Sequence, residues 1–143
     1  VPATHALASQ ESISNDDIKQ ETMLLLGTGH CFRDHVLQVC PEFARFSSNT
    51  EGIRKSFEGS SLETIRHMVA SGVGITVLPQ TACPRSRDDG FLCYIPFESP
   101  APNRRVVLAW RKSFARPAAI EALKQQLKAL DLPVQIIEAT KSS

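Results

Sequence analysis

Residues 27–40, GTGHCFRDHVLQVC, gather side chains that can do redox and nucleophilic chemistry. They hold two of the chain's four cysteines, Cys31 and Cys40, and two of its four histidines. A cysteine thiolate is a nucleophile and is the form that peroxides oxidise. Cys31, Cys40, Cys83 and Cys93 form no CxxC pair of the zinc-binding kind, so we expect neither a metal nor a cofactor. The segment therefore predicts thiol chemistry.

The elements around Cys31 favour its thiolate. The apolar run 22–27 predicts a buried strand, a Gly-Thr-Gly turn follows, and a helix is expected from Cys31 until Pro41 ends it. Free amides and the positive dipole end at a helix N-terminus stabilise an anion. His30 and Arg33 supply flanking cations, and Asp34 could orient either of them or cap the helix. The alternative is a His-Cys pair that serves packing and capping alone.

The helical spacing of the two cysteines predicts a conformational switch. Nine residues of unbroken helix hold them roughly 13 to 14 Å apart along the axis, on opposite faces. A disulfide needs Cα atoms about 4.4 to 6.8 Å apart. A helix this short is marginal alone and depends on packing by Phe32, Val36, Leu37 and Val39. The segment must therefore unwind before Cys31 and Cys40 can bond.

The remaining elements predict an α/β fold with a mostly parallel sheet of about five strands and three or four helices. Ser14 predicts one helix cap, and Ser60 or Ser61 predicts the cap of a helix that ends at Gly72. Glu63 stands three residues after Ser60, as a capping box requires. Strands are expected over 52–58, 74–79, 91–97, 104–111 and 132–137, and helices over 15–20, 61–72 and 117–130. A loop is expected over 42–52, a turn over 84–90 and a frayed tail over 138–143.

Composition and charge exclude some classes of protein. With 42% hydrophobic residues the chain can bury a core, and the formal charge of +1 leaves no basic patch for nucleic acid. No apolar run is long enough to span a membrane, and no signal-peptide pattern is present, so we expect a cytoplasmic protein. Cys83 and Cys93 are expected to be small buried hydrophobes, and His35 a solvated residue. A chain that begins at Val1 is expected to be a piece of a longer protein.

Three motifs resemble a known family. They are GHCFRD with a second cysteine nine residues after the first, SSLETIRHMVASGVGITVLP, and PNRRVVLAWR. Together they resemble the regulatory domain of OxyR, the peroxide-sensing branch of the LysR-type transcriptional regulators, from about Leu24 to Leu130. The second motif is typical of LysR-type effector domains at large, whereas the cysteine pair with GHCxRD is specific to peroxide sensing.

The resemblance implies roles for individual residues. Cys31 corresponds to the peroxidatic cysteine and Cys40 to the resolving cysteine. The histidine, arginine and aspartate of the family motif fall on His30, Arg33 and Asp34. A further arginine that stabilises the family's thiolate falls in the pair at 104 and 105, and Arg105 is our choice.

It also implies the architecture and the partners. The expected fold is a periplasmic-binding-protein-like LysR effector domain, mostly its second α/β half. Residues 1–103 would form subdomain II with the cysteine pair, and 104–143 the strand and helix that return to subdomain I. The family's DNA-binding domain is expected to lie outside this chain. Expected partners are hydrogen peroxide, promoter DNA through the absent domain, RNA polymerase, a glutaredoxin or thioredoxin-type reductant, and further copies in a dimer or tetramer, with no membrane.

The sequence therefore favours a peroxide sensor that controls antioxidant gene expression and is not an enzyme. Two alternatives remain open here. One is a thiol peroxidase-like enzyme that uses the same cysteine, and the other is a LysR-type effector domain that binds a small organic ligand.

Overall fold

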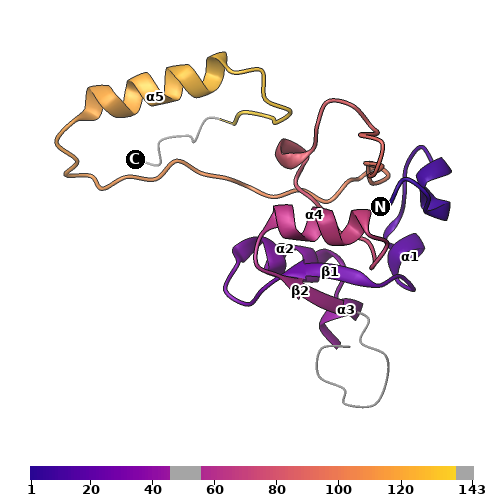
Figure 1. Cartoon of the computed structure of the whole chain (residues 1–143). Coiled ribbons are helices and arrows are strands. Elements are labelled where there is room, and N and C mark those ends of the chain that lie inside the picture. Colours follow the sequence, from indigo (N-terminus) through magenta and orange to yellow (C-terminus); the bar gives the residue numbers. More distant parts are fainter. Residues whose placement is uncertain (46–55, 138–143) are drawn as a thin grey trace. The chain divides into compact units, whose positions relative to one another are not determined.

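The computed structural model describes residues 1–45 and 56–137, and its contacts divide the chain into two units (Figure 1). Unit 1 comprises Val1–Pro79 and Cys83–Arg104, and unit 2 comprises Gln80–Ala82 and Arg105–Ser143. Among the described residues, no helix is long and apolar enough to cross a membrane.

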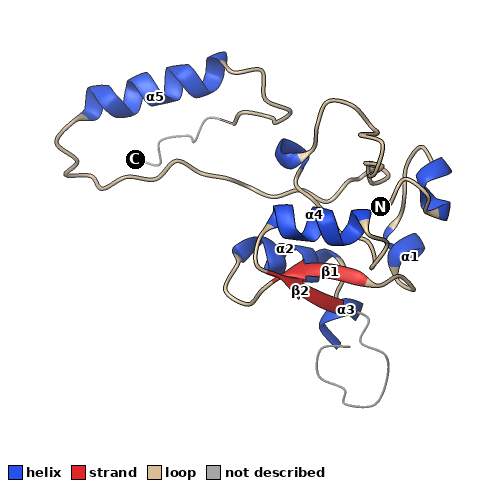
Figure 2. Ribbon diagram, viewed as in Figure 1, coloured by secondary structure: helices blue, strands red, loops and turns tan. Residues whose placement is uncertain are grey.

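A small parallel sheet organises unit 1 (Figure 2). Strand β1, Met23–Leu26, pairs in parallel with β2, Ser56–Gly59, in a register that sets Leu25 opposite Glu58. On the other side of β1, the amide of Leu24 donates to the carbonyl oxygen of Ile75 (2.8 Å), and the amide of Ile75 donates to that of Thr22 (2.8 Å). The strand β1 is therefore central, as its continuous apolar run predicts.

Alternate residues of β1 build two hydrophobic clusters, because successive side chains of a strand point to opposite faces. Leu24 and Leu26 pack with Ile65 and Val69, which belong to helix α4, Leu62–Ala70. Met23 and Leu25 belong to the other cluster, which also holds Leu7, Ile13, Ile18, Val36, Cys40, Phe43 and Ile75. All four β1 side chains are 7% exposed or less, so the strand is buried on both faces.

The helices of unit 1 follow the predicted pattern, with one addition. After the 3₁₀ turn η1, Ala6–Ser9, come α1 (Asn15–Ile18), α2 (Cys31–Val39), α3 (Glu42–Arg45) and α4. Ser14 caps α1 in a capping box with Asp17, which confirms the predicted cap. The loop predicted for 42–52 is wrong over 42–45, where α3 forms, and residues 46–52 lie outside the described part.

Of the two predicted caps for α4, Ser60 and Ser61, the structure uses Ser61. The side chain of Ser61, not Ser60, accepts the amide of Thr64 (3.1 Å), and Glu63 contacts Arg66 (3.4 Å). Gly72 has φ +79° and ends the helix as predicted, since that conformation suits glycine. At Gly59 a methyl group would overlap the side chain of Ile65, so this glycine allows α4 to lie close to β2.

Several predicted strands are wrong because their backbone groups find no neighbouring strand. The segment 74–79 pairs with β1 at Ile75 alone, and 91–97 is joined to its neighbours through isolated bridges. Residues 104–111 and 132–137 are exposed and form no strand among the described residues. Residues 52–55 of the predicted strand 52–58, and the predicted tail 138–143, lie outside the described part.

The described residues of unit 2 form one long helix and a large exposed apolar surface. Helix α5 covers Pro117–Ala129, with proline at its start, as predicted, and the short turn η2 covers Gln80–Ala82. The ammonium of Lys124 lies 4.9 Å from the centre of the Trp110 ring. Leu123 and Leu127 on α5 and Leu130 at its C-cap form one apolar stripe, the α5 stripe, but remain 37% to 55% exposed.

Candidate functional site

The turn between β1 and α2 presents Cys31 at the surface. Gly29 has φ +96°, a conformation that favours glycine, and the amide of Gly27 is held by the carbonyl oxygen of Gly59 (3.1 Å). His30 then serves as the N-cap residue of α2, and Cys31 is its first helical residue. Cys31 is exposed, so a small oxidant can reach its sulfur. The predicted helix start is confirmed.

Two of the motif side chains remain at the surface near Cys31. His30 is exposed and its ring makes no capping hydrogen bond. Asp34 is also exposed and lies in the first turn of α2, where a carboxylate interacts favourably with the helix dipole. His35, predicted to be solvated, is half-buried, and its Nδ1 atom has no hydrogen-bond partner among the described residues.

Arg33 faces the sheet. Its Nη1 atom donates to the carbonyl oxygen of Leu26 at 3.0 Å and lies 2.8 Å from Oε1 of Glu58. Arg33 is 12% exposed, so its guanidinium is largely enclosed between the ends of β1 and β2. Sequence reasoning missed Glu58, which belongs to no motif. It is recognisable only once the parallel register of β2 is known.

Arg104 contacts the residue next to Cys31. Its guanidinium carbon lies 5.1 Å from the centre of the Phe32 ring, within the range of a cation–π interaction. Phe32 packs against both hydrophobic clusters, so this contact connects the C-terminal end of unit 1 to the start of α2. Arg105 belongs to unit 2, and its role at Cys31 stays a prediction.

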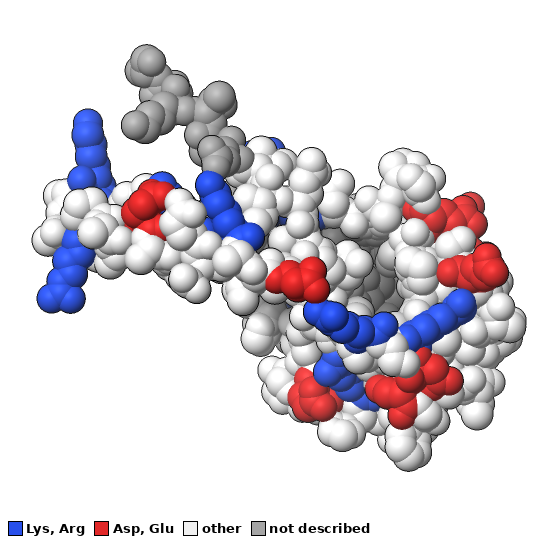
Figure 3. Space-filling model, turned by 90° about the horizontal axis from the view of Figure 1, so that it is seen from above, with Lys and Arg blue, Asp and Glu red and all other residues white. Residues whose placement is uncertain are grey.

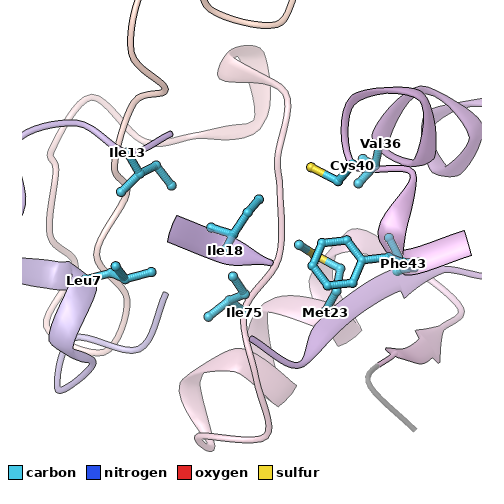
Figure 4. Close-up of a cluster of buried hydrophobic side chains, with 9 residues drawn as sticks. Leu7, Ile13, Ile18, Met23, Val36, Cys40, Phe43 and Ile75 are labelled. Carbon is cyan, nitrogen blue, oxygen red and sulfur yellow. The ribbon is translucent and has the colours of Figure 1, made fainter. Parts of the chain in front are cut away.

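Cys40 is buried at the far end of the same helix. Its amide donates to the carbonyl oxygen of Val36 (2.9 Å), and its side chain is fully enclosed. Its sulfur points into the cluster that contains Val36 and Phe43 (Figure 4). Burial raises the pKa of the Cys40 thiol to about 11, the carboxylate of Glu42 adds to the rise, and Lys19 opposes it. Cys40 is therefore a protonated thiol of low reactivity.

The helix keeps the two thiols apart. All four cysteines are free, and α2 is unbroken from Cys31 to Val39 with Cys40 as its C-cap residue. At 1.5 Å per residue, the rise from Cys31 to Cys40 is roughly 13 to 14 Å, well beyond disulfide reach. This is the dithiol conformation that the sequence predicts.

The other two cysteines lie elsewhere in unit 1. Cys93 is buried, as predicted, and its Sγ atom lies 3.6 Å from the carbonyl oxygen of Ala8. Cys83 is half-buried rather than buried, and desolvation raises the pKa of its thiol. Among the described residues, no group of three potential ligands could hold a metal ion.

The space beside the N-terminal turn of α2 is small. A cavity of about 10 Å³ is lined by residues of β1, α2 and α4, among them Phe32, Arg33 and Ile65. This volume suits a water-sized molecule. The geometry thus combines an exposed thiol, a buried second thiol, and a small cavity beside the start of α2.

The fold and this site define a class of protein. The model of the LysR substrate binding domain matches residues 1–131, and the chain belongs to this family. Within the family, it resembles proteins named for their response to peroxide. It is 36% identical over 139 residues to a "Probable hydrogen peroxide-inducible genes activator" of Streptomyces viridosporus, covering 95% of this chain and 43% of that protein.

Another relative is named OxyR. The chain is 35% identical over 125 residues to the "DNA-binding transcriptional dual regulator OxyR" of Escherichia coli K12, covering 87% of this chain and 39% of that protein. The chain thus spans about two fifths of the length of these curated relatives. Their names describe gene regulators and not enzymes.

Solved structures agree with this assignment. The reduced OxyR regulatory domain from Pseudomonas aeruginosa is 44% identical with a TM-score of 0.74, covering 91% of this chain and 60% of that one. A structure titled as the reduced form of OxyR gives a TM-score of 0.72, and one titled as its oxidised form gives 0.67. Both are 32% identical and cover 90% of this chain, and 57% and 58% of theirs. The chain is closer to the reduced form, in keeping with its free cysteines.

Proposed function

We propose that this chain is the hydrogen-peroxide-sensing regulatory domain of a LysR-type transcriptional regulator, with Cys31 as the peroxidatic and Cys40 as the resolving cysteine. The observation that carries the proposal is the contrast between the two ends of α2. An exposed thiol stands at the helix N-terminus, and a buried, protonated thiol stands at the C-cap. The relatives named as peroxide-inducible activators support the same reading.

The chemistry is a two-step oxidation. The Cys31 thiolate attacks one oxygen of hydrogen peroxide, the O–O bond breaks, and Cys31 becomes a sulfenic acid while hydroxide leaves and is protonated to water. The Cys40 thiol loses its proton and attacks the Cys31 sulfur, the S–O bond breaks, and a disulfide and a second water form. Two thiols are oxidised by two electrons, and one peroxide is reduced to two waters.

The second step requires a new backbone conformation. Because an intact α2 separates the sulfurs by far more than a bond length, the helix must unwind and Cys40 must leave its cluster before the disulfide closes. The sulfenic acid at Cys31 therefore persists until α2 unwinds. A redox event at one end of a marginal helix thereby selects a different fold of the segment.

The motif residues have supporting roles in this proposal. His30 and Asp34 lie at the start of α2, beside Cys31, where they can move a proton during peroxide reduction. An arginine of the 104–105 pair stabilises the Cys31 thiolate. The contact of Arg104 with Phe32 supports this assignment to the pair. Arg33 holds the start of α2 against the sheet.

The proposal extends to the longer protein. Residues 1–103 serve as effector subdomain II, and 104–143 return to subdomain I. The disulfide alters contacts within a dimer or tetramer and so changes how a separate DNA-binding domain holds a promoter and recruits RNA polymerase. This takes place in the cytoplasm, where a glutaredoxin or thioredoxin-type reductant resets the switch.

Thiol mapping of the full-length protein tests the proposal. After one equivalent of hydrogen peroxide, peptide mass spectrometry should recover a Cys31–Cys40 disulfide, and a Cys40→Ser variant should accumulate sulfenic acid at Cys31. Matched Cys83→Ser and Cys93→Ser variants should still form the disulfide. Oxidation of Cys83 or Cys93 in its place, with Cys31 left as a thiol, would refute the proposal.

A further inference from the structure

We infer that Glu58 is a positioning residue for the redox switch: through Arg33 it holds the first turn of α2 against the sheet and thereby stabilises the dithiol form. The inference rests on the proposed function, because it concerns the equilibrium between the Cys31–Cys40 dithiol and disulfide. Glu58 belongs to none of the motifs that mark the family.

The contact joins three elements at one point. Arg33 extends from the first turn of α2, two residues after Cys31. Its Nη1 atom bonds to the carbonyl oxygen of Leu26, the last residue of β1, at 3.0 Å and lies 2.8 Å from a carboxylate oxygen of Glu58, on β2. One guanidinium thus fastens the helix to both strands of the sheet. We call this Arg33–Glu58 contact the latch.

The surroundings make the latch significant for the position of α2. Arg33 is 12% exposed, and leaving it without a carboxylate in that setting is costly, whereas Glu58 is 47% exposed and can be solvated. On the visible face of unit 1, acidic and basic side chains lie interspersed rather than in fields of one sign (Figure 3).

The latch has a direct effect on the redox equilibrium. It depends on α2 being helical and docked, because residue 33 leaves this position when the segment 31–40 unwinds. A contact present in the dithiol form and lost in the disulfide form favours the dithiol form. Removing the latch shifts the thiol–disulfide equilibrium toward the disulfide. The Cys31–Cys40 disulfide then forms under less oxidising conditions.

The test measures this equilibrium in the full-length protein with Glu58→Gln, which keeps the shape of the side chain and removes its charge. Equilibration in a thiol–disulfide redox buffer should show the Cys31–Cys40 disulfide favoured about fivefold over the wild type, the scale of a partly exposed ion pair. That corresponds to a midpoint potential lowered by about 20 mV for this two-electron couple. Glu21→Gln is the matched control, because Glu21 pairs with His5 at 3.3 Å, a contact that does not involve α2.

A double-substitution cycle separates the latch from a general loss of charge. Arg33→Gln should favour the disulfide more than Glu58→Gln, since it also loses the bond to Leu26. Adding Glu58→Gln to Arg33→Gln should then produce no further shift. Additive shifts, or equal shifts in Glu58→Gln and Glu21→Gln, would overturn the latch while leaving the proposed function intact. Failure of the wild type to form the Cys31–Cys40 disulfide would overturn both.

Discussion

At the scale of single residues, Cys31 and Cys40 are chemically unlike although they lie on one short helix. Cys31 is exposed at the N-terminus of α2, while Cys40 is surrounded by apolar side chains that disfavour its thiolate. The proposed function needs this asymmetry, because Cys31 must be oxidised before Cys40 reacts with it. If the two thiols were equally reactive, peroxide could oxidise either cysteine first, and sulfenic acid would not form specifically at Cys31.

The raised pKa of Cys40 predicts a pH dependence of stability. The thiol titrates near 9.0 when the chain is unfolded and at about 11 in the fold. Below pH 9 both states are protonated, and the stabilisation is fully present. Between these values the unfolded state loses its proton first, so the stability of the reduced protein falls as pH rises, by about 2 kcal/mol in all.

Urea unfolding of the reduced protein between pH 8 and 11 checks this, with Cys40→Ala as the reference. The difference in unfolding free energy between the wild type and Cys40→Ala should shrink as pH rises. A difference that stays constant over this range would show that Cys40 titrates normally.

The arginine pair predicts a difference in rate. Since Arg104 contacts Phe32 beside Cys31, Arg104→Gln should slow the reaction of Cys31 with peroxide by about tenfold through loss of a cation near the thiolate. Stopped-flow measurement of sulfenic acid formation in a Cys40→Ser background gives the rate. Arg105→Gln is the matched substitution, and a larger loss of rate in that variant would assign the role to Arg105, as the resemblance implies.

The sequence predicts the features of single residues best where the neighbouring residues in the chain determine them. The helix start at Cys31, the cap at Ser14 and the glycine stop at Gly72 all follow from neighbours in the chain. The Arg33–Glu58 contact could not be predicted in this way. It depends on the register between two strands, and the strand signal around Glu58 was weak.

At the scale of elements, α2 is held mainly by packing and tethers. Nine residues form the helix, a length that is marginal alone. Val36 buries its side chain beside Cys40, and the side-chain amide of Asn15 donates to the carbonyl oxygen of Val39 (3.2 Å). The helix is therefore ordered in the dithiol form, but its stability comes from these contacts and not from the nine-residue helix alone.

Removing part of this packing should loosen the helix. Val36→Ala should lower the free energy of opening of α2 by about 1 to 2 kcal/mol, which raises amide exchange in the reduced protein by roughly 5- to 30-fold. Gln38→Ala, on an exposed position of the same helix, is the control and should leave exchange nearly unchanged. Equal effects of the two substitutions would mean that packing by Val36 does not hold α2.

More of the predicted helices than of the predicted strands are present in the structure. A helix closes its hydrogen bonds within the segment, so caps and periodicity locate it. A strand requires a partner, and the sequences 104–111 and 132–137 have strand-like composition without one in the described residues. The core strand β1 was predictable because its apolar run is buried on both faces.

At the scale of the whole molecule, the two units differ in how well they bury their apolar residues. Unit 1 contains the buried clusters, whereas unit 2 exposes Val106, Val107 and Trp110 as well as the α5 stripe. Exposed apolar surface of this extent is typical of a surface that binds another protein surface. The family match over 1–131 covers both units.

This exposure predicts self-association of the 143-residue chain in isolation. Leu123→Lys should reduce the association by placing a charge in the α5 stripe, while Gln126→Lys, an exposed polar position on the same helix, should not. Light scattering over a concentration series measures the mass. A chain that is monomeric at all concentrations would contradict the prediction.

Amide hydrogen exchange of residues 31–40, measured on the reduced and on the peroxide-treated full-length protein with the disulfide mapped in the same samples, tests the switch most directly. We predict that the Cys31–Cys40 bond forms and that the amides of Val36 to Cys40, protected in the dithiol form, exchange at rates near those of unstructured chain. A mapped Cys31–Cys40 disulfide with these amides protected as before would contradict the requirement that α2 unwinds.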